Sequence, residues 1–139
     1  MPFIHPLKLL FVHIPKNGGT SIEKKFDIND NSLVCCYRLE ELPYYCEEVD
    51  DTFLFSPQHF TPSLIKKYYE GFLKTYTTFT VVRDPYTRAI SEYLFRERKL
   101  LDFNDSHFLS WWKSFLISKL DHVLPQSEYF KNINYDFIL

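Results

Sequence analysis

An apolar run that ends in a glycine-rich loop decides the fold, and it reads Phe11-Val12-His13-Ile14-Pro15-Lys16-Asn17-Gly18-Gly19-Thr20-Ser21. The run predicts a buried strand over 7–14, and the loop leads into a predicted helix from Thr20 to about Ile28. Either Thr20 or Ser21 is expected near the N-cap of that helix. Glycines let the backbone approach a ligand, and the start of a helix presents unpaired N–H groups. With Lys16, the loop is a candidate site for phosphate or sulfate, and an ordinary strand–turn–helix corner with an exposed lysine is the alternative.

Composition sets the broad class of the protein. The chain has 139 residues, 45% of them hydrophobic and 24% charged. This predicts one globular domain over 1–139 with a real hydrophobic core. The formal net charge is −2. Because nucleic-acid binding without sequence preference needs a basic excess, that class of partner is not expected, and any anion site must be local.

Cysteine usage and hydropathy bear on the compartment. The three cysteines, Cys35, Cys36 and Cys46, have no metal-ligand spacing and are odd in number, which favours a reduced environment. No apolar segment is long enough to span a membrane or to serve as a signal peptide. We therefore expect no membrane segment and a cytoplasmic location. The sequence does not indicate the oligomeric state.

Strands and helices are predicted to alternate along the chain. Further strands are expected at 33–37, 52–55, 75–83 and 133–139, and helices at 63–72, from Pro85 to about Lys99, and at 106–118, with a short helix after Pro125. Residues 29–32 read as a turn, and 38–51 as a loop or short helix. The alternation predicts an α/β fold, a P-loop-type parallel sheet flanked by helices. The chain ends inside an apolar run, so we expect a C-terminal truncation.

The functional residues are expected at one edge of this sheet. In open α/β sheets, ligands bind at the carboxyl ends of the strands. Lys16, His59 and Arg83 all lie just beyond predicted strand ends, so they are expected to converge on one cleft.

A second motif follows the 75–83 strand and reads Val82-Arg83-Asp84-Pro85-Tyr86-Thr87-Arg88-Ala89-Ile90-Ser91. Ser91 lies about two helical turns inside the next helix, on the same face as Arg88. A guanidinium from the strand end and a hydroxyl from the helix can hold a phosphate together. The alternative is that Arg83 pairs with Asp84 or another carboxylate and that Ser91 only fills space beside the sheet.

Taken together, the two motifs resemble the sulfotransferase superfamily, and most closely its carbohydrate-type branch with an H-I-P-K-x-G-G-T-S loop. Members use 3′-phosphoadenosine 5′-phosphosulfate (PAPS) as the sulfuryl donor and release adenosine 3′,5′-bisphosphate. The resemblance implies that Arg83 and Ser91 bind the 3′-phosphate. It also implies that the 5′-phosphosulfate is bound by the loop residues Lys16, Asn17, Gly18, Gly19, Thr20 and Ser21.

Two further segments extend the resemblance. Gln58-His59-Phe60-Thr61-Pro62 holds the only histidine between the two motifs. The family likeness makes His59 the catalytic base, and the near-neutral pKa of an imidazole suits that role. A structural role is the alternative. The segment Leu124-Pro125-Gln126-Ser127-Glu128-Tyr129-Phe130 is similar to one near the acceptor cleft of the family. This makes Gln126 a candidate substrate residue, with an exposed glutamine on a short helix as the alternative.

The other histidines are not assigned to the reaction. His13 is expected to be packed inside the predicted strand. His5, His107 and His122 have no supporting context in the sequence.

The predicted function is transfer of a sulfuryl group from PAPS to a hydroxyl, on a carbohydrate by the resemblance, with Lys16 and His59 as catalytic residues and no metal. One alternative is a truncated or degenerate module that binds the nucleotide without turnover. A remote alternative is a P-loop kinase, in which Asp84 would hold magnesium. In this chain, however, Lys16 precedes the glycines and Asn17 follows it, whereas the kinase loop needs the glycines first and a hydroxyl residue next. Relatives are often luminal Golgi proteins, in contrast to the cytoplasmic location expected here.

Overall fold

A four-stranded sheet forms the centre of the molecule. The computed structural model describes residues 3–26, 57–97, 104–118 and 120–139. The strands β1 (Phe3–Ile4), β2 (Leu9–Val12), β3 (Thr77–Thr80) and β4 (Phe137–Ile138) lie in that order across the sheet. The pairs β2–β3 and β3–β4 are parallel, with Leu10 opposite Thr78. The predicted α/β fold with a parallel sheet is confirmed, apart from β1, an antiparallel edge strand that was not predicted.

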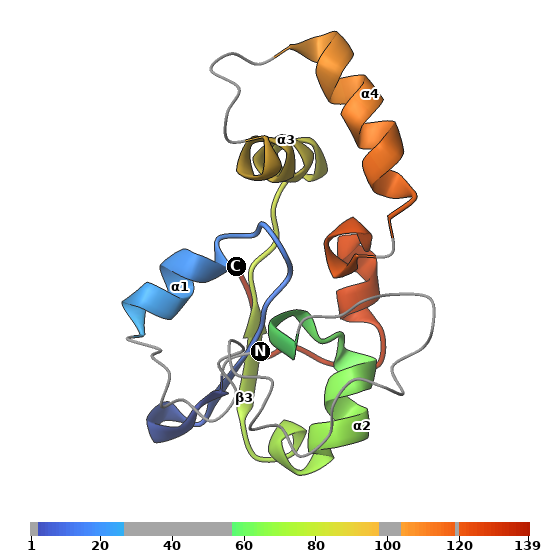
Figure 1. The fold of residues 1–139 in the computed structure, drawn as a ribbon. Helices are drawn as coiled ribbons and strands as arrows, with labels where there is room; N and C mark the ends of the chain where they lie inside the picture. The colour runs from blue at the N-terminus through green and yellow to red at the C-terminus, as the bar shows by residue number, and fades with distance from the viewer. Residues whose placement is uncertain (1–2, 27–56, 98–103, 119) are drawn as a thin grey trace.

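Helices cover both faces of the sheet and the edge where its strands end (Figure 1). The helix α1 (Gly19–Lys25) lies on one face, and α2 (Pro62–Leu73) lies on the other. The helix α3 (Pro85–Arg96) lies beyond the carboxyl end of β3, and α4 (Asp105–Leu116) packs outside it. Four short 3₁₀ helices complete the described elements: η1 (His5–Leu7), η4 (Pro57–His59), η5 (Asp121–Val123) and η6 (Gln126–Phe130).

Alternation along β2 divides the hydrophobic core into two clusters. Leu10 and Val12 point to the face covered by α2 and η6, where they pack in one cluster with Ile65 and Tyr129. Phe11 points to the opposite face, where it packs with Phe79 and with the partly buried side chains of α1. All of these strand side chains are buried. Successive residues of a strand point to opposite faces, so this short, continuous apolar run can fill both layers.

The observed strands are shorter than the predicted ones. Lys8 has a left-handed backbone (φ 49°) and caps η1, so β2 begins at Leu9 instead of residue 7. The predicted 75–83 strand is regular only over Thr77–Thr80. The hydroxyl of Thr75 instead donates to the Gly71 and Phe72 carbonyls at the end of α2. These hydrogen bonds attach Thr75 to the end of α2, so the strand begins later than the composition of residues 75–83 predicts.

Helix starts were predicted with mixed success. Thr61 is the N-cap of α2, and Pro62 is its first residue, as expected. Asp84 caps α3 by accepting a hydrogen bond from the Thr87 N–H at 2.9 Å. The expected cap of α1 at Thr20 or Ser21 is wrong, because the left-handed Gly18 (φ 84°) occupies the N-cap. A backbone turn, and not a side-chain cap, starts that helix.

Several predictions lie outside the described residues. These are the turn at 29–32, the strands at 33–37 and 52–55, the 38–51 segment, and the three cysteines. The extent of the domain stays a prediction. Within the part of the chain that the structure describes, no helix has the length and apolar character needed to cross a membrane.

Candidate active site

The glycine loop is shaped by a histidine beneath it. A β-carbon added to Gly19 would lie 1.8 Å from Nε2 of His13, so the imidazole packs directly against the glycine backbone. The neighbouring Gly18 has a positive φ of 84°, which side-chain-bearing residues rarely adopt. Each glycine is thus required for a different reason, Gly18 for the turn and Gly19 for the close approach of His13.

Lys16 lies at the apex of the loop in a left-handed conformation, with φ 66°. This conformation is uncommon for a residue with a side chain. The ammonium group lies 3.8 Å from the centre of the Phe95 ring, on α3, in a cation–π contact. The Lys16 carbonyl accepts a hydrogen bond from the Arg83 guanidinium at 3.3 Å. The Arg83 side chain, from the segment that follows β3, therefore contacts the backbone of the loop.

Asn17 and Gln126 connect the loop to the end of β3. The Asn17 amide donates to the Val81 carbonyl at 2.8 Å and to the side-chain oxygen of Gln126. The Gln126 amide in turn bonds to both backbone groups of Arg83, accepting from its N–H at 3.1 Å and donating to its carbonyl at 2.7 Å. The side chain of Asn17 is buried beneath the loop, and that of Gln126 is engaged by the backbone.

Arg88 fastens the other side of the loop. Its guanidinium donates to the carbonyls of Pro15, Leu124 and His122 at 2.9, 3.0 and 3.1 Å. One side chain of α3 thereby holds the loop against η5 and the segment that follows it. Arg88 lines a different pocket from Ser91, one turn further along α3.

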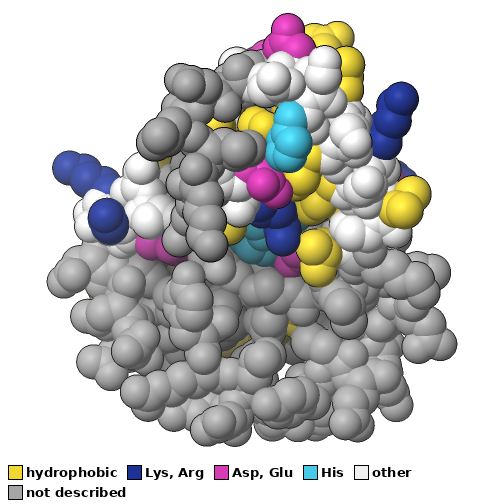
Figure 2. Space-filling model, turned by 45° about the horizontal axis from the view of Figure 1, so that its top comes forward, with side chains coloured by type: hydrophobic (Ala, Val, Ile, Leu, Met, Phe, Trp, Pro, Cys, Tyr) yellow, Lys and Arg dark blue, Asp and Glu magenta, His cyan; other side chains and the backbone are white. Residues whose placement is uncertain are grey.

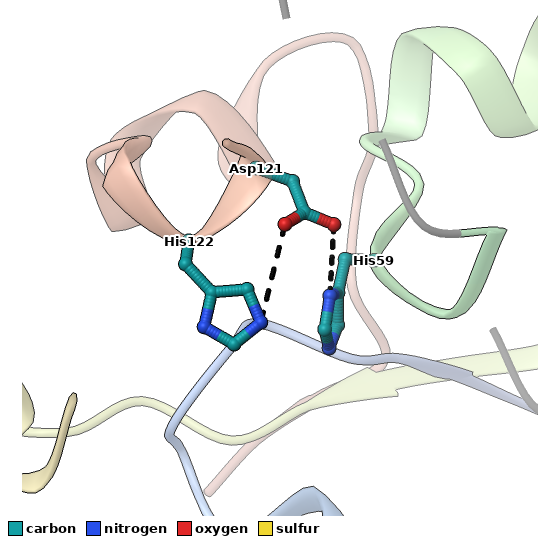
Figure 3. Close-up of side chains that lie close together, drawn as sticks. All are labelled: His59, Asp121 and His122. Carbon is teal, nitrogen blue, oxygen red and sulfur yellow. Dashed lines mark hydrogen bonds and ion pairs between the residues drawn. The ribbon is translucent and has the colours of Figure 1, made fainter. Parts of the chain in front are cut away.

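His59 is paired with a buried carboxylate (Figure 3). Its Nδ1 lies 2.9 Å from Oδ2 of Asp121, which η5 brings beside η4. An ionised carboxylate only accepts hydrogen bonds, so Nδ1 carries the proton and Nε2 keeps a lone pair. The backbone carbonyl of His59 also accepts a hydrogen bond from the buried hydroxyl of Tyr129 at 3.1 Å. The imidazole is therefore fixed in both orientation and tautomer.

Burial controls the protonation of this histidine. Burial lowers the pKa of His59 to about 4, against the opposing effect of the Asp121 carboxylate, while His13 and His122 lower it further. His59 is consequently neutral at neutral pH and able to accept a proton. Burial also lowers the pKa of His13, whose Nδ1 lies 3.2 Å from Oε1 of Glu23. The His13 and His59 rings meet edge to face, 4.8 Å apart at their centres.

His122 forms a second histidine–carboxylate pair. Its Nδ1 lies 2.8 Å from Oε2 of Glu92, a buried residue of α3 whose other oxygen pairs with Arg96. Burial opposes the ionisation of Glu92, but the bonds to His122 and Arg96 leave its pKa lowered. The imidazole of His122 lies edge to face with that of His59, with 4.8 Å between the ring centres.

These two histidines and Asp121 also form a set of possible metal ligands. Their donor atoms lie within 4.8 Å of one another, and Nε2 of His122 is 3.9 Å from Oδ1 of Asp121 (Figure 3). Two imidazoles and a carboxylate are ligands that a divalent transition metal accepts. The expectation that the reaction uses no metal stays a prediction.

A cavity of about 380 Å³ gathers most of the predicted site residues, and we call it the donor pocket after the ligand that the sequence predicts for its loop. Histidine, acidic and basic side chains lie close together near the centre of the face shown in Figure 2. Asn17 and Ser21 do not line the donor pocket, and neither does Gln126. The pocket is lined by His13, Lys16, Gly18, Gly19, Thr20, Gln58, His59, Arg83, Ser91, Phe95 and His122.

A second pocket, of about 420 Å³, adjoins the first. Lys16 and His122 line both cavities, so they form the wall between them. Its lining combines one face of α3, the end of α4 and the segment around η5. The remaining lining residues are Pro85, Arg88, Ala89, Glu92, Trp112, Leu116, Val123, Pro125, Gln126 and Ser127.

Sequence reasoning missed three site residues: Asp121, His122 and Glu92. Asp121 and His122 are adjacent to each other, but 62 residues separate Asp121 from His59. No local spacing pattern connects them. Asp121 could be recognised as a site residue only once its partner, His59, was known. His13 was expected to be packed, and it is buried, although it also lines the donor pocket.

Comparison with known proteins supports the assignment of the family. No curated protein and no solved structure matches the chain significantly. The model of one protein family, described as the sulfotransferase family, matches residues 4–138. That match covers both motifs, the histidine pairs and the strands β2, β3 and β4, so the chain belongs to the sulfotransferase family.

Proposed function

We propose that the protein transfers a sulfuryl group from PAPS to a hydroxyl acceptor. The observation that carries the proposal is the donor pocket, which brings Lys16, Arg83 and the His59–Asp121 pair around one cavity. Two cations at the mouth of a glycine loop suit a nucleotide that carries both a phosphosulfate and a second phosphate. The acceptor predicted by the family motifs is a carbohydrate.

Arg83 and Ser91 support binding of the donor through its 3′-phosphate. They lie on adjacent elements, the end of β3 and the body of α3, and both line the donor pocket. Arg83 is exposed, and Gln126 fixes its backbone on both sides. Because the Arg83 backbone is fixed and its guanidinium is exposed, this side chain is suited to bind the 3′-phosphate. Binding at this distance from the reacting sulfur would act by fixing the position of the donor.

We assign His59 as the general base that accepts the proton of the acceptor hydroxyl. As the acceptor oxygen forms a bond to sulfur, the bond from sulfur to the 5′-phosphate oxygen breaks, and that oxygen leaves with the electron pair. The hydroxyl proton passes to Nε2 of His59, which is the unprotonated nitrogen of the pair with Asp121. Asp121 keeps the ring in this tautomer and stabilises the imidazolium that forms. Lys16 is assigned to neutralise the charge that grows on the leaving phosphate oxygen.

Asn17 and Gln126 are assigned supporting roles. The amide of each is committed to hydrogen bonds that join the loop to the β3 end. We therefore assign Asn17 to hold the loop from below and Gln126 to fix the backbone of Arg83. Asp84, the magnesium ligand that the kinase alternative would need, accepts the N-cap hydrogen bond of α3 through Oδ1.

The test compares transfer with donor binding. Wild-type protein should convert labelled PAPS and an alcohol to a labelled sulfate ester, and should bind adenosine 3′,5′-bisphosphate in calorimetry. His59→Ala should retain nucleotide binding and lose about 10² to 10⁴-fold in turnover, as expected when a general base is removed. Lys16→Ala should lose about 10² to 10³-fold, as expected for a group that stabilises transition-state charge.

Lys8→Ala is the matched control for Lys16→Ala. Lys8 is also a left-handed lysine, but it lies at the end of η1 and lines neither pocket. It should behave like wild type. Nucleotide binding without product from any acceptor would identify a binding module. Absence of nucleotide binding would refute the donor assignment.

A further inference from the structure

The second pocket suggests where the acceptor binds and what kind of molecule it is. It meets the donor pocket at Lys16 and His122, so a molecule in one cavity can reach a molecule in the other at that wall. Its volume of about 420 Å³ is in the range of small-molecule sites. The inference rests on the proposed function, because a second substrate is needed only if transfer takes place.

The apolar wall of this pocket comes from α4. This helix carries two adjacent apolar stripes. The first consists of Phe108, Trp111 and Phe115, and it packs on α3, with the Trp111 ring 5.2 Å from that of Tyr93. The second consists of Leu109, Trp112 and Leu116, at the i, i+3, i+7 spacing of one helix face.

The second stripe is the more exposed of the two. Leu109 and Leu116 are 57% and 48% exposed. Trp112 and Leu116 line the second pocket instead. The ring of Trp112 is braced by Phe108 and Phe115, with centres 6.0 and 5.7 Å away. It therefore presents a supported aromatic surface to the cavity.

The polar groups of the same pocket are largely committed to the protein itself. The Arg88 guanidinium donates to three backbone carbonyls. Both oxygens of Glu92 are engaged, by Arg96 and His122. The Gln126 amide bonds to the backbone of Arg83 and to Asn17. Among the residues that the structure describes, the pocket thus contains many polar side chains but few polar groups directed at a ligand.

This arrangement disfavours a ligand with many hydroxyls. Each buried hydroxyl without a partner costs free energy, whereas burying an apolar ring is favourable in proportion to its area. An unsubstituted sugar has too many polar groups for these walls. A flat apolar ring with one hydroxyl matches them, if that hydroxyl lies at the end where Lys16 and His122 meet the donor pocket.

We propose that the second pocket binds the acceptor, and that the acceptor is a phenol or ring alcohol whose apolar body packs on Trp112, Leu116 and Val123. The hydroxyl lies at the wall formed by Lys16 and His122. Glu92 holds the His122 imidazole at this wall, and His59, which is assigned the hydroxyl proton, lines the donor pocket on the other side. In this view the acceptor class differs from the carbohydrate that the family motifs predict.

The experiment uses the full chain with labelled PAPS and two acceptors, 2-naphthol and methyl β-glucopyranoside. We expect labelled 2-naphthyl sulfate and no labelled glucoside. Trp112→Ala should raise the KM for 2-naphthol about tenfold or more, as expected when an aromatic anchor is truncated. Binding of adenosine 3′,5′-bisphosphate should be unchanged, because Trp112 does not line the donor pocket.

A second variant avoids the risk that truncation unfolds α4. Leu116→Trp fills the pocket from an exposed position, and it should abolish binding of 2-naphthol in calorimetry with nucleotide-loaded protein. Ile117→Trp is the matched control, since Ile117 is the next residue, is 84% exposed and lines neither pocket. This control should bind 2-naphthol like wild type.

The outcomes separate the two proposals. Transfer to the glucoside but not to 2-naphthol would overturn the acceptor class, and so would 2-naphthol binding that Leu116→Trp leaves unchanged. Failure of 2-naphthol to bind, with nucleotide binding intact, would overturn the pocket assignment and leave the donor assignment standing. Failure of the nucleotide to bind would overturn the proposed function itself, and the acceptor pocket with it.

Discussion

The two pockets that meet at Lys16 and His122 contain similar residue types but differ in where those residues direct their hydrogen bonds. In the donor pocket, the exposed Arg83 guanidinium donates to the Lys16 carbonyl at 3.3 Å, and Gln126 fixes the Arg83 backbone. In the second pocket, Arg88 and Gln126 direct theirs to backbone groups of the protein. The residue types in a pocket lining therefore do not determine how polar the pocket is to a ligand. That polarity depends on which hydrogen-bonding groups of the lining are already bonded to the protein itself.

The largest expected effect is a loss of stability at low pH, because the donor pocket contains two buried histidines of lowered pKa. Burial lowers the pKa of His59 to about 4, and it also lowers that of His13. In the unfolded chain each titrates near 6.5, so the unfolded chain binds more protons between these values. The stability contributed by neutral His59 is fully present above pH 6.5 and is lost as the pH falls toward 4.

The expected loss from His59 is about 3 kcal/mol in the free energy of unfolding across this pH range. Urea titrations at pH 7 and pH 4.5 measure it. His59→Asn can still donate to Asp121, and it should show a shallower dependence on pH. Equal slopes for wild type and His59→Asn would contradict the assignment of the buried neutral imidazole.

The second test separates the pockets by breaking the loop alone. In Gly19→Ala, the new methyl group would overlap the His13 ring, which it would approach to 1.8 Å. Overpacking of this kind costs about 1 to 3 kcal/mol of stability. Calorimetry should also show loss of nucleotide affinity, because relief of the clash must move the loop.

Gly71→Ala is the control for that substitution. An added β-carbon at Gly71 meets nothing within 4 Å, and the residue lies inside α2. It should stabilise the protein by about 0.5 to 1 kcal/mol, because alanine loses less backbone entropy on folding. The interpretation of the loop fails if Gly19→Ala binds nucleotide as tightly as Gly71→Ala.

The third and smallest effect concerns Gln126, which lines the second pocket and holds the backbone of Arg83, a residue of the donor pocket. Gln126→Ala removes the hydrogen bonds to Arg83 and Asn17, and we expect a loss of about 1 kcal/mol in thermal or urea unfolding. Gln126→Glu keeps the accepting oxygen and loses the donor, so its stability should be intermediate. Ser127→Ala, at the exposed neighbour, should be neutral. If nucleotide affinity does not change in Gln126→Ala, the residue does not position Arg83.

The donor side could be predicted from sequence because its geometry is local. The turn at Gly18 and the close approach at Gly19 each need glycine, so the sequence records them directly. The strand before the loop is equally local, since a continuous apolar run can serve both faces of a sheet. The ends of the strands could not be predicted, because they depend on hydrogen bonds such as those of Thr75 to the end of α2.

The histidine pairs could not be predicted because their partners are remote. Asp121 reaches His59 only through the packing of η5 beside η4, and Glu92 reaches His122 across 30 residues. The role of Gln126 could not be predicted for the same reason. Nothing in the local sequence around Gln126 indicates that its side-chain amide bonds to the backbone of Arg83, 43 residues away.

Arg88 has a consequence for the order in which the molecule assembles. Its three carbonyl partners lie 73, 36 and 34 residues away along the chain. The loop it fastens is complete by residue 21, but the bonds that fasten it require the segment around residue 124. Contacts between distant residues form late, after the entropy of closing the intervening chain has been overcome. During synthesis, the glycine loop therefore leaves the ribosome long before it is clamped, and affinity for nucleotide should arise only as the last helical turns emerge.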